Sequence, residues 1–164
     1  RRRGEEPGVV FIVTYRPPVD AWVVELPAGM VDAGETVPQA AARELQEETG
    51  YSVNADDVRV FLGGAAVCYP TPWASTESYL CCEVDVDGDL SVNARPTPRL
   101  EDDEHFAAVL LIPVSKLIQV MEVLVRRHGC LLEPRGVGLA QGLALAGRCA
   151  AATGAAAARD RDRV

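Results

Sequence analysis

The stretch that most constrains this chain is residues 29–51, which read GMVDAGETVPQAAARELQEETGY. Thr36, followed three residues later by Gln39, has the spacing of a capping box, which marks the start of a helix. Gly50 is suited to end that helix in a left-handed conformation, because glycine adopts it without steric cost. Together these signals predict a helix over residues 37–49.

The predicted helix has one acidic face. At about 100° per residue, Glu44, Glu47 and Glu48 fall on one arc of the helix. Like charges at this spacing repel one another, and Arg43 relieves only part of the repulsion. Mg²⁺ prefers oxygen ligands and is commonly held by carboxylates together with substrate phosphates. This face is therefore a candidate magnesium site; the alternative, in a protein with a net charge of -8, is a solvated acidic face.

The order of residue types across the whole stretch resembles the signature of the Nudix hydrolases. In that family the stretch is a loop–helix–loop that binds a divalent metal and supports hydrolysis of a nucleoside diphosphate linked to another group. The resemblance implies the family's α+β fold, an α/β/α sandwich with a mixed β-sheet. The matching positions are Gly29, Glu35, Arg43-Glu44-Leu45, Glu47-Glu48, Gly50 and Tyr51.

Other stretches resemble the branch of ADP-ribose and ADP-sugar pyrophosphatases, and the resemblance covers residues 9 to about 147. It implies that ADP-ribose and water react to give AMP and ribose 5-phosphate. The alternatives are a Nudix diphosphatase for another nucleoside diphosphate derivative, such as an oxidised one, or a nucleotide-sugar-binding module that has lost turnover. The stretches are RPP at 16–18, ELPAGMVDAGE at 25–35 and NARPTPRLEDDEHF at 93–106.

The resemblance also assigns the metal ligands. Glu44 and Glu48 are the main side-chain ligands, and the backbone carbonyl of Ala28 is a further one. Glu47 assists as a ligand or through a water molecule, and it belongs to the catalytic set as well. The implied metal is Mg²⁺, with Mn²⁺ as a substitute.

The remaining roles concern the substrate and the attacking water. Arg16 matches the arginine that contacts the diphosphate, and Gly29 and Met30 are expected to bind the substrate. Glu104 matches the carboxylate that activates or orients the water, while Arg43 holds the loop before the helix in place. From the residues alone, Arg16 could equally form a surface ion pair, and Glu104 could belong to a solvated acidic loop.

The chain of 164 residues is long enough to bury a core. We expect a polar lead-in at 1–8, a Nudix domain over 9–150 and a disordered Ala-rich tail at 151–164. The acidic balance argues against a nucleic-acid partner. The five cysteines lack a C-x-x-C spacing, so we expect reduced, mostly buried thiols rather than disulfides or a zinc site.

No apolar run reaches membrane-spanning length and no signal peptide is evident, so we expect no membrane contact. The cytoplasm is the expected location, with the nucleus as the alternative. The expected partner is a nucleoside diphosphate sugar. The resembling branch has an additional N-terminal segment that stacks on adenine and forms a swapped dimer. This chain starts about where that segment would end, so we expect a truncated chain, and a homodimer only if the segment exists.

Hydrophobic patterning predicts the other elements. A helix capped by Ser115 should bury one apolar stripe, and a second helix should cover residues 138–152. The stripe consists of Leu117, Val120, Met121, Leu124 and Val125. The expected strands are residues 9–15, 21–26, 58–62, 64–68, 79–86 and 106–112.

Overall fold

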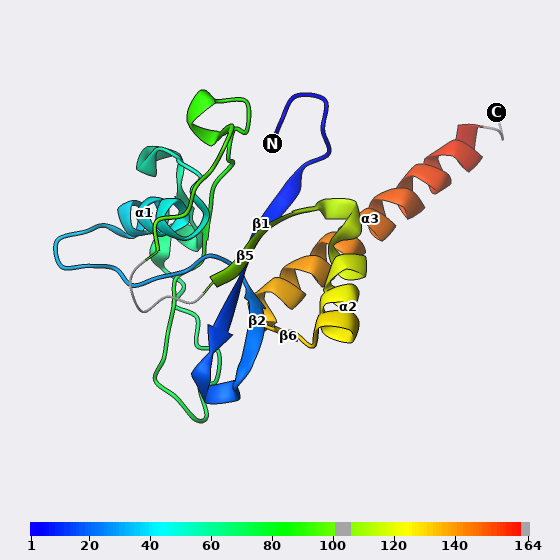
Figure 1. The fold of residues 1–164 in the computed structure, drawn as a ribbon. Helices are drawn as coiled ribbons and strands as arrows, with labels where there is room; N and C mark the ends of the chain where they lie inside the picture. Colours follow the sequence, from blue (N-terminus) through cyan, green and yellow to red (C-terminus); the bar gives the residue numbers. More distant parts are fainter. Residues whose placement is uncertain (101–105, 162–164) are drawn as a thin grey trace. The chain divides into compact units, whose positions relative to one another are not determined.

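The computed structural model describes residues 1–100 and 106–161 of the chain (Figure 1). The described residues divide into two compact units. The first unit comprises residues 1–7 and 27–100, and it contains the predicted acidic helix. The second unit comprises residues 8–26 and 106–161.

The second unit is built on a four-stranded mixed sheet. Its strands are β1 (Gly8–Arg16), β2 (Ala21–Glu25), β5 (Phe106–Pro113) and β6 (Leu131–Leu132), in the order β5-β1-β2-β6. β1 is antiparallel to both of its neighbours, and β2 is parallel to β6. Three of these strands match the expected ones to within two residues at each end. Sequence patterning missed β6, because two residues are too short to show a period.

Two helices, α2 (Leu117–His128) and α3 (Pro134–Arg161), pack against this sheet (Figure 1). Alternate residues of β1 supply the sheet side of the core, as the period of two in a strand requires. α2 begins at Leu117 with Lys116 at its N-cap, so the predicted cap at Ser115 is wrong by one residue. The core consists of Phe11, Val13, Val24, Ile112, Leu117, Met121, Cys130 and Ala140.

Two further expectations about these helices need correction. Val125, expected in the buried stripe, is 42% exposed and is not part of the core. α3 is longer than the expected 138–152, since it begins at Pro134, where proline is tolerated in a first turn, and it runs to Arg161.

The first unit contains α1 (Val37–Thr49) and a two-stranded antiparallel sheet. The sheet pairs β3 (Arg59–Val60) with β4 (Cys82–Glu83), so the expected strands 58–62 and 79–86 are each reduced to two residues. The strand expected at 64–68 is absent from the described structure. A 3-10 turn at Phe61–Gly64 precedes an isolated bridge between Cys68 and Tyr79.

The mixed sheet and the three helices confirm the α+β class. None of the five cysteines, all of which lie in the described residues, forms a disulfide, but the expectation that most of them are buried is wrong. Cys130 is buried, Cys68 and Cys81 are half-buried, and Cys82 and Cys149 are exposed. Within the described part of the chain, no helix combines the length and apolar character needed to cross a membrane.

Candidate active site

Hydrogen bonds at both ends fix where the helix that carries the glutamates begins and stops. At the N-terminal end, the backbone N–H of Thr36 donates to Oε1 of Gln39 over 2.9 Å, which completes the predicted capping box. At the other end, Gly50 has φ of 77° and its N–H donates to the Gln46 carbonyl over 2.8 Å. The predicted helix 37–49 is therefore confirmed, and its glutamates are fixed relative to the loop that precedes it.

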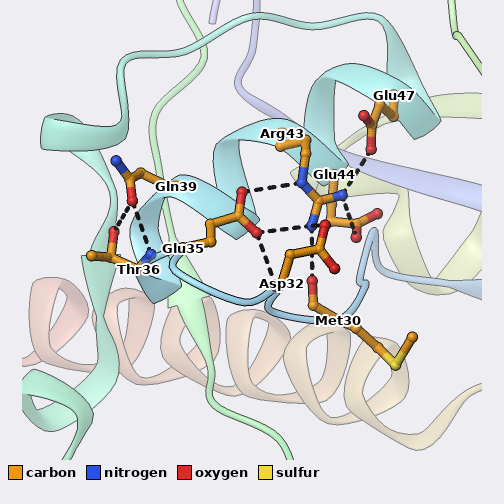
Figure 2. Close-up of polar contacts among 8 residues, drawn as sticks. All are labelled: Met30, Asp32, Glu35, Thr36, Gln39, Arg43, Glu44 and Glu47. Carbon is orange, nitrogen blue, oxygen red and sulfur yellow. Dashed lines mark hydrogen bonds and ion pairs between the residues drawn. The ribbon is translucent and has the colours of Figure 1, made fainter.

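Arg43 lies at the centre of the acidic face, as Figure 2 shows. Its Nε and Nη2 donate to the two carboxylate oxygens of Glu35 over 3.1 and 3.0 Å. Its Nη1 donates to Glu44 over 2.8 Å and to Glu47 over 2.9 Å. Nη2 also donates to the carbonyl of Met30 over 2.8 Å. The guanidinium thus connects Glu35 and the Met30 carbonyl of the loop with Glu44 and Glu47 of the helix.

This arrangement changes the electrostatics of the segment. Hydrogen bonds from Arg43 hold the pKa of Glu35 below its ordinary value, against the opposing effect of burial. The same contact, with those to Glu44 and Glu47, raises the pKa of Arg43. The sequence predicted that Arg43 would relieve part of the repulsion through Glu47, four residues away. In the structure Arg43 also contacts Glu35 and Glu44, so it reduces charge repulsion in the loop as well as in the helix.

Three of the predicted ligand positions, Ala28, Glu44 and Glu48, lie near one another at the start of the loop. Glu48 is 4% exposed, and its Oε2 accepts a hydrogen bond from the backbone N–H of Ala28 over 2.9 Å. The Glu44 carboxylate lies against Gly29: a Cβ added there would be 1.9 Å from Cδ and Oε1 of Glu44. A side chain at position 29 would thus occupy the space of that carboxylate. The backbone of residues 28–29 and two carboxylates of α1 therefore share one small region.

A contact that sequence reasoning missed holds the end of α1. The backbone N–H of Arg99 donates to the carbonyl of Glu47 over 2.7 Å. This bond satisfies one of the carbonyls that the last turn of a helix leaves without an intrahelical partner. No sequence pattern signals it, because any residue except proline could provide the backbone donor.

Two further predicted site residues are Arg16 and Glu104. Arg16 belongs to the second unit, where its Nε and Nη2 donate to the two oxygens of Glu25 over 2.8 and 2.7 Å. Sequence reasoning missed Glu25, although a carboxylate that closes the apolar strand AWVVE was a usable signal. Glu104 lies outside the described residues, so its predicted role is not addressed by the structure.

The loop–helix segment coincides with a known domain family. The family model for the NUDIX domain matches residues 1–132. This chain belongs to the Nudix family. The match includes α1 and the loop before it, so the carboxylate region described above is part of the Nudix domain.

Three proteins with known names are similar to this chain. The chain is 32% identical to the ADP-ribose pyrophosphatase of Saccharomyces cerevisiae, covering 87% of this chain and 58% of that one. It is 33% identical to the ADP-sugar pyrophosphatase of Mus musculus, covering 71% and 50%. It is 40% identical to the ADP-ribose pyrophosphatase of Bacillus subtilis, covering 72% and 58%. The chain spans about half the length of the curated relatives it matches.

Nudix hydrolases generally depend on a divalent metal, and the Nudix segment here offers donors of the right chemistry. Glu44 and Glu48 supply carboxylate oxygens beside the backbone of Ala28 and Gly29, and hard divalent cations prefer oxygen donors. In residues 1–100 and 106–161, no three acidic, histidine or cysteine side chains are gathered as a ready-made metal site. The cation that Glu35, Glu44 and Glu47 surround in this structure is the guanidinium of Arg43. The fit to a divalent metal thus rests on the oxygen chemistry of these donors and on the family, and not on a preformed cluster of three side chains.

Proposed function

We propose that this Nudix domain hydrolyses the diphosphate of ADP-ribose, or of a related ADP-sugar, to AMP and a sugar phosphate with the help of Mg²⁺ or Mn²⁺. One observation carries the proposal: the convergence of the Ala28–Gly29 backbone with the carboxylates of Glu44 and Glu48. The names of the relatives, ADP-ribose pyrophosphatase and ADP-sugar pyrophosphatase, support the choice of substrate.

In this proposal Glu44 and Glu48 hold the metal, with the Ala28 carbonyl and Glu47 as further ligands. A metal bound there would neutralise charge on the diphosphate and lower the pKa of its bound water. Arg43 keeps three glutamates at fixed positions through the hydrogen bonds of its guanidinium. It acts as a positioning residue, because its donors are directed at the protein's own carboxylates and at the Met30 carbonyl.

Three residues of the described structure, Arg16, Gly29 and Met30, are proposed to bind the substrate. A guanidinium such as that of Arg16 matches the geometry of phosphate oxygens and can bind them bidentately. Gly29 and Met30 are proposed to contact the substrate, and the Met30 side chain is 82% exposed. Glu104, which is outside the described residues, is proposed to orient and deprotonate the attacking water. The proposed location is the cytoplasm, where the reducing conditions keep thiols from forming disulfides.

The test is release of AMP from a substrate panel. The purified protein is incubated with Mg²⁺ and, in parallel reactions, ADP-ribose, ADP-glucose, NADH and oxidised nucleoside diphosphates. The proposal predicts the highest kcat/KM for ADP-ribose or ADP-glucose. Faster hydrolysis of an oxidised nucleotide would replace it with another Nudix diphosphatase activity, and tight binding without turnover would replace it with a binding module. A parallel series with EDTA should abolish product formation.

A further inference from the structure

The second unit contains a buried carboxylate that the proposed mechanism does not use. Glu25 closes β2, and its side chain is 8% exposed. Removing a carboxylate from water is costly unless a charged or hydrogen-bonding partner compensates for it. Here Arg16 does so with two parallel hydrogen bonds, of 2.8 and 2.7 Å, in the bidentate geometry that fixes a guanidinium most firmly.

The strand register shows how far Arg16 must reach for this contact. Glu25 is opposite Ile12 in the β1–β2 pair, whereas Arg16 is opposite Ala21. The Cα atoms of Arg16 and Glu25 are therefore offset by about 13 Å along the strands, the length of four strand residues. The Arg16 side chain has to run back along its own strand, over the face that also carries Thr14. The ion pair thus keeps the Arg16 side chain extended along the strand direction.

The direction of this reach is toward the end of β2. The two partners differ in exposure: the Arg16 side chain is 52% exposed, against 8% for Glu25. The pair therefore has a buried anchor and an accessible cation, so an anion in solution can approach the guanidinium.

We propose that Glu25 is a positioning residue for Arg16, holding the guanidinium in the orientation that binds the diphosphate of the substrate. This inference rests on the proposed function, since it deepens the role given there to Arg16. Without Glu25, the long arginine side chain would regain its rotamer freedom, and binding a diphosphate would have to order it again.

A purely electrostatic role for Glu25 predicts the opposite change in the affinity for an anion. If the carboxylate only reduced the positive charge of Arg16, then Glu25→Gln would strengthen the attraction of an anion. If it positions the guanidinium, the same substitution weakens anion binding, because glutamine offers one oxygen where glutamate offers two. The direction of the change in affinity therefore distinguishes the two roles.

The experiment is a double-mutant cycle on the binding of inorganic pyrophosphate, measured by isothermal titration calorimetry at fixed ionic strength. The variants are Arg16→Ala, Glu25→Gln and the double variant. We expect each single substitution to weaken binding by roughly tenfold, a typical consequence of losing a charge-assisted hydrogen bond. The double variant should bind no more weakly than Arg16→Ala, because Glu25 acts through Arg16.

Glu133→Gln is the matched control. Its carboxylate is also largely buried, at 16% exposure, and accepts a hydrogen bond from Nε of Arg135 over 2.7 Å in the same unit. It should lower the melting temperature without changing the affinity for pyrophosphate. Should Glu25→Gln fail to fold, Glu25→Asp keeps the charge, shortens the side chain by one methylene and should still weaken binding.

Unchanged or tighter binding of pyrophosphate by the Glu25 variants would overturn the inference, as would additive losses in the double variant or no binding by the unsubstituted protein. The cycle needs no turnover, so it is separate from the test of the proposed function. If the cycle gives the expected affinities but the protein releases no AMP from ADP-ribose, the proposed activity is wrong and the positioning role of Glu25 is retained.

Discussion

Gly29 offers the sharpest perturbation of the carboxylate region. A Cβ at this position would lie 1.9 Å from Cδ and Oε1 of Glu44 and 2.3 Å from Oε2. Ordinary contact begins near 3.4 Å, so the carboxylate of Glu44 must retreat by about 1.5 Å in Gly29→Ala. The obstructing atoms are the far end of a flexible side chain, so the fold can absorb this movement at small cost.

The expected result is a large loss of activity with little loss of stability. Displacing a catalytic group by about 1 Å can cost roughly 100-fold in rate, so Gly29→Ala should lower kcat for ADP-ribose hydrolysis by about that factor. The assay is AMP release under saturating Mg²⁺, with the melting temperature followed by circular dichroism. Gly142→Ala is the control, since a Cβ there meets nothing within 4 Å. Turnover by Gly29→Ala equal to that of the unsubstituted protein would refute the reasoning.

Three further predictions follow from the same segment. Glu48→Gln should leave the fold intact and lower the rate of AMP release by orders of magnitude, since it removes a proposed metal ligand; near-native turnover would contradict that assignment. Arg43→Ala should lower the melting temperature by several degrees at neutral pH. Because Arg43 lowers the pKa of Glu35, its stabilising effect is present above the ordinary value of 4.5 and is lost as pH falls through the lower folded pKa. The difference in melting temperature between the two proteins should therefore shrink in acid, and a constant difference would argue against this contact. Gly50→Ala combines a φ of 77° with a Cβ 2.1 Å from the Thr97 backbone nitrogen. We expect a loss of more than about 2 kcal/mol in the free energy of unfolding, measured in urea, and a loss below about 0.5 kcal/mol would contradict the described packing.

Local signals predicted the acidic helix well because they act within one turn of it. The spacing of Thr36 and Gln39 and the glycine at position 50 set both ends, and the structure places the helix at Val37–Thr49. The strand at Gly8–Arg16 was equally clear, because a β-branched run followed by two prolines leaves few alternatives.

The failures of the sequence reading concern interactions between distant residues. The stretch at 79–86 has strand composition, yet two of its residues, Cys82–Glu83, form β4, because pairing depends on a partner of equal length. The bond from Arg99 to Glu47 joins backbone atoms 52 positions apart, and no side-chain type encodes it. The pairing of Arg16 with Glu25 depends on strand register, which the sequence alone did not supply.

The most direct test of the account is a crystal of the protein grown with Mn²⁺, with data collected for anomalous scattering. The account predicts an anomalous peak at the carboxylates of Glu44 and Glu48, beside the backbone of Ala28, and loss of that peak in Glu48→Gln. An anomalous peak elsewhere on the protein with none at these carboxylates, in crystals that diffract well enough to show manganese, would contradict it.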